Sequence, residues 1–422
     1  MRMGTRNGVI FTAALAVTSL LVAPASAAPQ SLSRAIDGVA RGGDVSVAVS
    51  ARGQTLYEHA GDERRTPASV QKILLSLALF DEFGPSHRIP TRVLSAKPSG
   101  AVGNLWIVGG GDPSMVSGWG DSTHTGVQRL ANRIERAGIT RVRGSVMVDS
   151  SRFADDWHAP GWQAWSRDFA GRPTALALDG NGTPNPPLSI GASLTDALEM
   201  RGIEVGERPR SGRVPASARL VTSVRSASLR TLVTHMNVTS SNFYAEMLGK
   251  LLGGRTFEAP GTMSKGVRAI EEFGARHDVK LVAHDSSGLS YANRVSASGI
   301  VTLLGHARSH PWGRTLRLSL PSPGQGTLTG RLAGLGVHAK TGTLWNGASA
   351  LAGWVRLRHG GTAEFAVLSR NSSKSTEDAI VQRVAAELKA PEKRAEPQPS
   401  LDTRCHLVQW WREIRPPLRT PE

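Results

Sequence analysis

Strand patterns at both ends of the chain constrain its fold more than any other feature. Residues 44–50 (DVSVAVS) alternate in hydropathy as a half-buried strand does, and residues 54–59 could pair with them across Arg52-Gly53. Three further strand patterns follow one another late in the chain, at residues 337–343, 348–358 and 363–369. We therefore expect two early and three late strands to form one antiparallel sheet, with the middle of the chain inserted between its halves.

Helical patterns accompany both groups of strands. Residues 31–42 read as a short helix, and a second helix follows Pro67. The apolar residues of this second helix recur at the spacing of one helix face, at Val70, Ile73, Leu74, Leu77 and Ala78. Residues 376–390 read as a closing helix. The expected fold class is thus α/β, with an antiparallel sheet flanked by helices.

The middle of the chain has a different character. Residues 96–215 are rich in Gly, Pro and short strand-like runs, so we expect a separate, β-rich inserted domain there. Residues 28–95 and 216–390 then form one discontinuous domain around it. A length of 422 residues exceeds that of a typical single domain and agrees with this division.

Both ends of the chain read as segments outside the folded part. Residues 1–27 have the pattern of a secretory signal peptide, with Arg2 and Arg6, an apolar run and then Ala25-Ser26-Ala27. The apolar run of about 14 residues is shorter than the roughly 20 that span a bilayer, and retention as a membrane anchor is the alternative. We expect an exported protein of the cell envelope or the medium. Residues 391–422 are rich in Pro and charge and are expected to be disordered.

The charge and the cysteine content narrow the function classes. The formal net charge is +16, which favours electrostatic contact with an anionic cell envelope. Nucleic acid is not an expected partner, because the chain is exported and has no cluster of basic and aromatic residues. Cys405 is the only cysteine, so neither an internal disulfide nor a thiolate metal site is expected. The histidines show no consistent zinc spacing, and we expect no metal.

Ser69 and Lys72 form the only Ser-x-x-Lys pair of the chain. They share one face of the predicted helix, and the helix start favours negative charge at Ser69. A serine hydroxyl needs a base to become a good nucleophile, and a lysine can be that base only if its pKa falls from about 10.4 toward 7. The ordinary alternative is a helix start with a surface lysine. We interpret the pair as a candidate nucleophile and base.

A second candidate motif is Ser240-Ser241-Asn242. It follows a helix expected near Leu229 and lies just before an amphipathic helix that is expected from Tyr244 and stops at Gly253-Gly254. Helix capping is the ordinary alternative. The pattern is weak, since Ser369-Arg370-Asn371 also fits Ser-x-Asn.

A third candidate motif is Lys340-Thr341-Gly342-Thr343, on a predicted strand edge. Glycine at such a position permits close approach of a ligand to the backbone, and the lysine offers a cation to a carboxylate. The ordinary alternative is an unremarkable strand end. Chain order raises the weight of all three motifs, because a nucleophile helix, a central Ser-x-Asn and a late Lys-Thr-Gly strand recur in penicillin-binding proteins and serine β-lactamases.

With these motifs, the chain resembles the D-Ala-D-Ala carboxypeptidase/endopeptidase family of low-molecular-mass class C penicillin-binding proteins. Residues 108–113 (VGGGDP) are similar to the family's Gly-Asp-Pro segment, and residues 285–296 are similar to its Gly-Leu-Ser segment. The 171 residues between Ser69 and Ser240 also match the family, because class A β-lactamases place these motifs much closer together. The resemblance implies a serine transpeptidase/β-lactamase-like fold over residues 31–390.

The resemblance also implies roles for single residues. Ser69 is the expected acylated nucleophile and Lys72 its base. Lys340 is expected to bind the substrate carboxylate with help from Thr341, and Gly342 and Thr343 to bind the substrate beside it. The remaining expected roles are proton relay by Ser240, an amide contact by Asn242, an oxyanion hole from the N–H groups of Ser69 and Thr343, and a substrate side-chain contact by Asp112. For Asp112 the alternative is an aspartate that caps its own loop.

The expected function is that of a serine-type D-Ala-D-Ala carboxypeptidase that acts on peptidoglycan stem peptides through an acyl-enzyme on Ser69. Endopeptidase cleavage of cross-links would use the same site. No cofactor is expected, and β-lactams are expected to be covalent inhibitors. The alternatives are a β-lactamase, for which no deacylating glutamate is identifiable, and a non-catalytic cell-wall-binding or β-lactam-sensing protein.

Overall fold

The computed structural model describes residues 30–40 and 44–389. The predicted signal peptide (1–27) and the predicted disordered tail (391–422) lie outside these residues. In the described part of the chain, no helix combines the length and apolarity needed to cross a membrane.

The five predicted strands form one antiparallel sheet, in the order β13-β14-β15-β1-β2. Their bounds are Asp44–Ala51 (β1), Gln54–His59 (β2), Val337–Thr343 (β13), Ala348–Arg356 (β14) and Thr362–Arg370 (β15). The position of β1 between β15 and β2 joins the two ends of the chain, since Val47 pairs with both His59 and Val367. The predicted α/β fold with this sheet is therefore confirmed.

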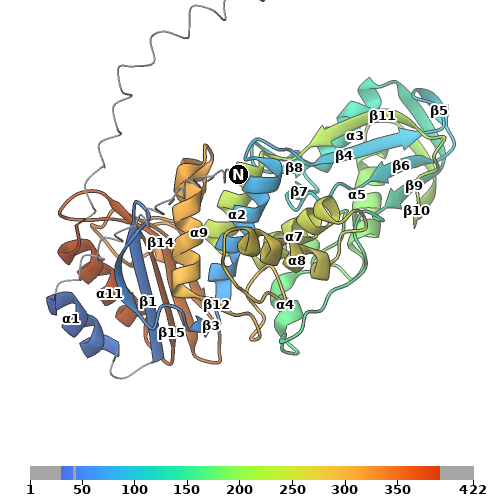
Figure 1. Ribbon diagram of the computed structural model, residues 1–422. Coiled ribbons are helices and arrows are strands. Elements are labelled where there is room, and N and C mark those ends of the chain that lie inside the picture. The colour runs from blue at the N-terminus through green and yellow to red at the C-terminus, as the bar shows by residue number, and fades with distance from the viewer. Residues whose placement is uncertain (1–29, 41–43, 390–422) are drawn as a thin grey trace, which may run out of the picture.

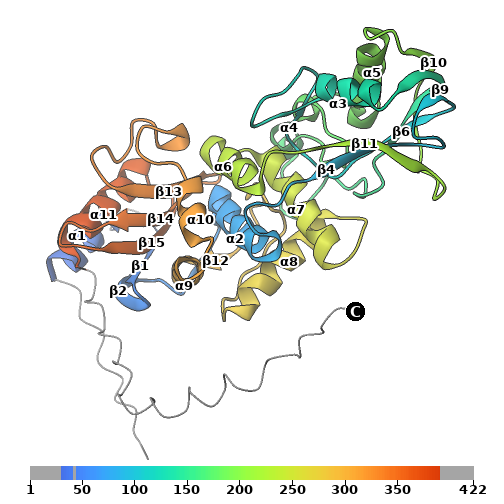
Figure 2. The ribbon, with the colours of Figure 1, turned by 90° about the horizontal axis from the view of Figure 1, so that it is seen from above.

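Helices cover both faces of this sheet (Figure 2). On one face lie α1 (Gln30–Ala40) and α11 (Lys374–Glu387), which share a core with Val45, Val47 and Val49. On the other face lie α2 (Gln71–Phe83), α9 (Ala297–Ser309) and α10 (Gly313–Ser319), whose core includes Ala48 and Ala352. The small alanine side chains on this second face let the helices approach the sheet closely.

Three more helices continue the second layer: α6 (Leu229–Thr239), α7 (Asn242–Thr256) and α8 (Met263–Arg276). The expectation that the helix from Tyr244 is amphipathic and stops at Gly253-Gly254 is wrong. Residues 243–253 of α7 are buried on all sides, and the helix runs on to Thr256. The glycines serve close packing, because a Cβ on Gly253 would lie 2.4 Å from the backbone nitrogen of Gly266 on α8.

A second sheet of six strands forms the far end of the molecule (Figure 1). Its strands are β4 (Pro90–Ser95), β5 (Gly100–Val102), β6 (Leu105–Val108), β9 (Ile139–Asp149), β10 (Glu204–Ser211) and β11 (Arg219–Arg225). Five of the strands follow the order β10-β9-β6-β4-β11. β9 lies between β10 and β6 and is parallel to both. This sheet extends from Pro90 to Arg225, beyond the expected limits of 96–215 on both sides.

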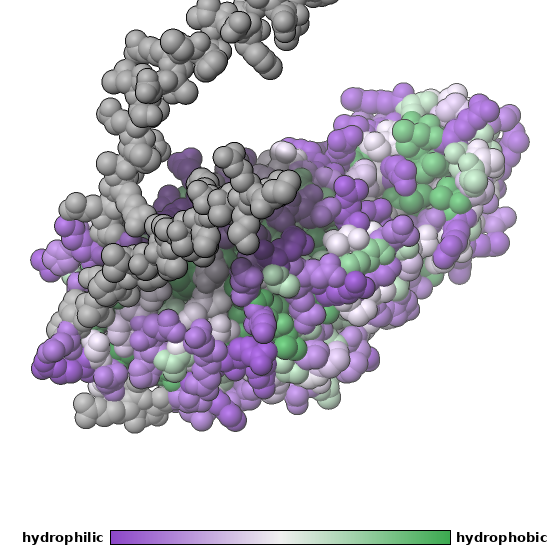
Figure 3. Space-filling view, in the orientation of Figure 1, coloured by the Kyte–Doolittle hydropathy of each residue, from purple (hydrophilic) through white to green (hydrophobic). Residues whose placement is uncertain are grey.

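The inserted part also contains two long helices that the sequence analysis did not predict, α3 (Val127–Arg136) and α5 (Pro186–Glu199). Both pack on one face of the second sheet and share a core with Val93, Ile107 and Val146. The opposite face carries a cross-strand row of partly or largely exposed apolar side chains, namely Leu220, Leu94, Trp106 and Met147. Hydrophobic residues gather over this end of the otherwise mostly hydrophilic surface (Figure 3).

Short elements complete the described chain. They are β3 (Arg64–Arg65) paired with β12 (Val295–Ser296), β7 (Met115–Val116) paired with β8 (Thr125–Gly126), α4 (Ser166–Ala170), and the 3-10 helices η1 (Ala68–Val70), η2 (Asp179–Asn181) and η3 (Gly326–Leu328).

Candidate active site

Ser69 lies in the 3-10 turn η1, which leads directly into α2. The preceding residue, Ala68, has a φ of +47°, a left-handed conformation that costs energy for a residue with a Cβ. Two glycines enclose the turn. A Cβ on Gly342 of β13 would lie 3.0 Å from the Ser69 nitrogen, and one on Gly288 would lie 1.9 Å from the Ala68 carbonyl oxygen. Close backbone packing from two sides thus holds the strained turn, with Ser69 half-buried at its surface.

Lys72 lies one turn after Ser69 and is completely buried. Its Nζ lies 3.0 Å from Oγ of Ser69, 2.8 Å from Oδ1 of Asn242 and 2.5 Å from the carbonyl oxygen of Ser287. Burial lowers the pKa of Lys72 to about 7, against the opposing influence of Asp285 and Glu246. At neutral pH a large fraction of Lys72 is therefore uncharged, and its lone pair can accept the Ser69 proton.

Ser240 and Lys340 form a second pair beside the first. Ser240 ends α6 in a left-handed conformation with a φ of +57°, and its Oγ accepts a hydrogen bond of 2.9 Å from Nζ of Lys340. Lys340 is completely buried and also donates to the carbonyl oxygen of Thr341 at 2.8 Å. Burial, and next the charge of Lys72, hold the pKa of Lys340 well below its usual range. Ser241 caps α7 by accepting from the Tyr244 nitrogen.

β13 is an edge strand, and its open edge runs past the turn that carries Ser69. The Leu344 N–H bonds to Ala348 across the β13–β14 pair, whereas the Ala339 N–H bonds away from β14 to the Pro321 carbonyl. Because N–H directions alternate along a strand, the N–H of Thr343 also points away from β14, toward the open edge. The Thr343 side chain is exposed, while Thr341 is buried.

Two buried carboxylates support the pair of Ser69 and Lys72. Asp285 accepts five hydrogen bonds, from the backbone nitrogens of Gly288 and Ser290 and from the side chains of Ser287, Asn293 and Trp162. These bonds hold the loop that presents the Ser287 carbonyl to Lys72. The sequence reading singled out this segment without a role for Asp285.

Glu246 is the functional candidate that the sequence reading missed. It lies one turn after Asn242 on α7, and it accepts a hydrogen bond of 2.9 Å from the Ser287 nitrogen. Burial, and next the charge of Asp285, raises the pKa of Glu246 to about 8. The only available signal was its spacing of four residues from Asn242, which places both on one helix face.

An aromatic cluster forms one side of the site and was also missed. Trp165 packs against Trp345 with ring centroids 4.2 Å apart, and Phe169 and Tyr291 complete the cluster. Trp345 is 71% exposed and Phe169 is 53% exposed, so apolar surface faces solvent here. Nδ2 of Asn242 donates a hydrogen bond of 3.2 Å to the Phe169 carbonyl oxygen, and this bond connects the cluster to the site.

Asp112 lies in the inserted part, and its bonds are those of a loop-capping residue. Its buried carboxylate accepts from the backbone and hydroxyl of Ser114 and from the hydroxyl of Thr125. The structure thus brings together Ser69, Lys72, Ser240, Asn242 and the strand that carries Lys340, and places Asp112 in a separate network. In the described part of the chain, no group of three or more His, Cys, Asp or Glu side chains is placed to hold a metal ion.

A hydroxyl beside a buried lysine of lowered pKa is the arrangement of a serine hydrolase that works through an acyl-enzyme. The sequence comparison agrees in detail, because the D-Ala-D-Ala carboxypeptidase 3 (S13) family matches residues 32–185 and 182–389. The chain therefore belongs to this family of serine-type D-Ala-D-Ala carboxypeptidases, as its motif order predicts.

Single relatives extend this result. The D-alanyl-D-alanine carboxypeptidase of Actinomadura sp. (strain R39) is 29% identical over 483 residues, covering 89% of this chain and 88% of the relative. Carboxypeptidase DacB of Mycolicibacterium smegmatis is 30% identical over 360 residues, covering 78% of this chain and 76% of the relative.

The same fold occurs in a solved structure. Penicillin binding protein 4 (dacB) of Haemophilus influenzae matches with a TM-score of 0.70 at 18% identity, over 83% of this chain and 98% of that protein. The structure of that protein complexed with a β-lactam gives a TM-score of 0.66 at 18% identity, over 84% of this chain and 98% of that chain.

Proposed function

We propose that the chain cleaves the terminal D-Ala-D-Ala bond of peptidoglycan stem peptides, with Ser69 as the acylated residue. The observation that carries the proposal is the 3.0 Å contact between Oγ of Ser69 and a buried Lys72 whose pKa is about 7. Uncharged Lys72 takes the hydroxyl proton as Oγ attacks the carbonyl carbon of the penultimate D-alanine. The N–H groups of Ser69 and Thr343 then stabilise the oxyanion that forms.

Breakdown of this intermediate needs a proton for the leaving amine. Ser240 is suited to relay the proton that Lys72 took from Ser69, because its hydroxyl can donate its own proton to the amine and take that proton in exchange, while Lys340 holds the hydroxyl in place. The relay leaves Lys72 uncharged again. The C–N bond breaks, D-alanine leaves as the amine, and the acyl group stays on Oγ of Ser69. Water then attacks the ester with Lys72 as base, which releases the shortened peptide and restores the hydroxyl. If a second amine attacks, or the scissile bond is a cross-link, the same steps give transpeptidation or endopeptidase cleavage.

Recognition of the free terminal carboxylate falls to Lys340 and Thr341 at the edge of β13. Burial disfavours the charged form of Lys340, and an entering carboxylate favours it, so substrate binding would itself raise the pKa of Lys340. Gly342 leaves room for the peptide backbone beside Ser69, and Asn242 offers its amide. A side-chain contact by Asp112 stays a prediction, and its loop hydrogen bonds favour the capping alternative.

β-Lactams fit the same steps, because their strained amide presents a carbonyl carbon to Ser69 and a carboxylate to Lys340. The β-lactam complex of the Haemophilus influenzae protein, which has the same fold, supports this proposal. The expected location is outside the cytoplasm, where peptidoglycan lies, and the net positive charge suits an anionic envelope.

Intact-mass analysis after incubation with penicillin, followed by turnover of a D-Ala-D-Ala pentapeptide, tests the proposal. We expect one covalent adduct, mapped to Ser69, and release of D-alanine. Ser241→Ala is a matched control, since Ser241 belongs to the same motif region but caps a helix. An adduct on another serine would overturn the assignment of the nucleophile. Rapid release of penicillin would favour a β-lactamase, and acylation without peptide turnover would favour a sensing protein.

A further inference from the structure

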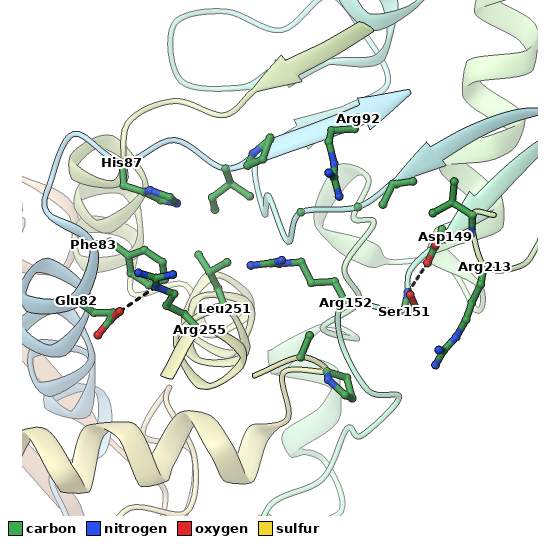
Figure 4. Close-up of a pocket in the computed structure, with 18 residues that line it drawn as sticks. Glu82, Phe83, His87, Arg92, Asp149, Ser151, Arg152, Arg213, Leu251 and Arg255 are labelled. Carbon is green, nitrogen blue, oxygen red and sulfur yellow. Dashed lines mark hydrogen bonds and ion pairs between the residues drawn. The ribbon is translucent and has the colours of Figure 1, made fainter. Parts of the chain in front are cut away.

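A cavity of about 810 Å³ lies between the helical layer and the inserted sheet, away from Ser69 (Figure 4). One wall is the edge of the sheet where the parallel strands β6, β9 and β10 end, near Val108, Asp149 and Arg213. In sheets with parallel strands, ligands characteristically bind beyond the carboxyl ends of the strands. The loop after β6 is the Gly-rich segment of residues 108–113, and its Gly109 and Gly110 line the cavity.

The opposite wall comes from helices that also build the active site. Phe83 ends α2, which begins beside Lys72, and Leu251 and Arg255 lie toward the end of α7, which begins with Asn242. Ten residues of α2 separate Lys72 from Glu82, or about 15 Å at the rise of an α-helix. The cavity is thus a separate site that shares two rigid helices with the reaction centre.

The charge of the cavity is positive. Four arginines line it (Arg92, Arg152, Arg213 and Arg255), against two carboxylates (Glu82 and Asp149). Glu82 pairs with Arg255, and the Asp149 oxygens accept from the backbone nitrogens of Ser151 and Val214. Within residues 30–40 and 44–389, no carboxylate lies within ion-pair distance of Arg92, Arg152 or Arg213.

Arg92 lies on β4 and Arg152 in the loop after β9, and their side chains point into the same cavity (Figure 4). Their charges oppose each other: burial, and next the charge of Arg92, lowers the pKa of Arg152. Burial, and next Arg152 and Arg255, likewise lowers the pKa of His87 on the same cavity. An anion between these groups would relieve the repulsion.

The shape of the donors selects the anion. A guanidinium presents a fork of N–H groups that binds two oxygens at once. The two oxygens of a carboxylate occupy one fork, whereas a phosphate group has enough oxygens to accept from two arginines. Arg213, which has no carboxylate within ion-pair distance among the described residues, and the cavity volume leave room for a second anionic group.

We propose that this cavity binds a phosphate-bearing ligand with two or more anionic groups, held chiefly by Arg92 and Arg152. The site is distinct from the peptidase site and does not depend on acylation of Ser69.

Calorimetric titration of the whole protein at low, constant ionic strength tests the proposal. The probes are inorganic phosphate, tripolyphosphate and citrate, a multivalent carboxylate. We expect tripolyphosphate to bind most tightly, phosphate less tightly and citrate at least tenfold more weakly than tripolyphosphate. Equal binding of citrate would overturn the selection of phosphate. Equal binding of phosphate and tripolyphosphate would overturn the need for more than one anionic group.

Arg92→Gln and Arg152→Gln should each raise the Kd for tripolyphosphate about tenfold or more. Arg143→Gln is the matched control. It also removes one positive charge, but Arg143 lies in the middle of β9, far from the end of that strand that borders the cavity. Peptide turnover should be unchanged in all three variants. The binding of tripolyphosphate is measured separately from turnover, so failure of this proposal and failure of the proposed peptidase function can be told apart. Binding that survives both cavity variants, or no binding at millimolar probe, would overturn the site. His87 provides a second measurement, since a bound phosphate should raise its pKa, and an unchanged His87 titration would contradict binding there.

Discussion

Nζ of Lys340 donates a hydrogen bond of 2.9 Å to Oγ of Ser240, a residue 100 positions away in the sequence. This bond links the edge strand to the end of α6, and it fixes the buried amine of Lys340 where we propose that the carboxylate of a peptide binds and draws a proton onto it. A charge-assisted hydrogen bond contributes about 1.5–3 kcal/mol, or roughly 10- to 150-fold in rate. The bond therefore leads to a prediction about substrate choice.

We predict that the protein prefers a D-Ala-D-Ala peptide with a free carboxylate over its C-terminal amide, and that Lys340→Ala abolishes this preference. The measurement is kcat/KM on both substrates in parent and variant. Equal loss on both substrates would instead assign Lys340 an electrostatic effect on Lys72, whose charge influences the pKa of Lys340.

The pH dependence of acylation should follow Lys72. Its pKa is lowered to about 7, and only the uncharged form can accept the Ser69 proton. The rate of penicillin acylation should therefore fall about tenfold per pH unit below 7 and level off above it. Lys72→Ala should lose several orders of magnitude at every pH, as removal of a catalytic base commonly does, whereas Lys280→Ala, an exposed control, should not. A variant at Lys72 that acylates within tenfold of the parent contradicts the assignment.

Glu246 is predicted to be a positioning residue that acts through Lys72. Its pKa of about 8 keeps it largely protonated at neutral pH, so Glu246→Gln changes the local shape little. Because Glu246 is neutral below pH 7, the acid limb of the pH–rate profile should stay where Lys72 places it, and the glutamine oxygen can still accept from the Ser287 nitrogen. Glu246→Ala removes this acceptor, so the loop that presents the Ser287 carbonyl to Lys72 should loosen and the rate of acylation should fall at least tenfold. Glu272→Ala on α8, whose carboxylate pairs with Arg268, is the control, and a Glu246→Ala variant that acylates like the parent would contradict the positioning role.

Gly342→Ala should damage activity more than stability. A Cβ at this position would lie 2.7 Å from the Pro67 carbonyl oxygen and 3.0 Å from the Ser69 nitrogen, so the nucleophile turn must shift. Displacements of about 1 Å at a reacting group can cost about 100-fold in rate. Gly305→Ala is the control, because a Cβ there has no neighbour within 4 Å. Measurement of kcat/KM beside the melting temperature separates the two effects, and a fully active Gly342→Ala would show that the turn tolerates displacement.

The sequence predicts the catalytic sheet well, because each of its strands is short, apolar and bounded by turns. The inserted part is predicted less well for two reasons. β4 and β11 continue the sheet beyond the change in composition near residues 95 and 215. Residues 127–136 do carry a helical spacing, with buried Val127, Leu130, Ala131 and Ile134, but the Gly and Pro content around them hid the signal.

The candidate site divides in the same way. Ser69, Lys72 and Lys340 stand in motifs whose chemistry can be read from residue type and spacing. Glu246 and Asp285 act through burial and through backbone bonds across the fold, and neither property is visible in one dimension. A glycine can end a helix, or it can let a second helix pack closely, and the sequence alone does not distinguish the two. For Gly253 and Gly254 the predicted helix end is wrong, because Gly253 lies inside α7 in close contact with α8.

The order of the strands in the first sheet has a consequence for the order in which the parts of the chain can fold. Ser50 and Glu364 lie on neighbouring strands but are 314 residues apart, and closing a loop of that length costs about 5 kcal/mol in chain entropy. β2 can pair with one side of β1 early, but the other side has no partner strand until β15 has been synthesised. The inserted sheet, whose strands all lie within residues 90–225, is free to form first. A growing chain therefore carries its nucleophile long before it carries Lys340, and the catalytic centre is assembled last.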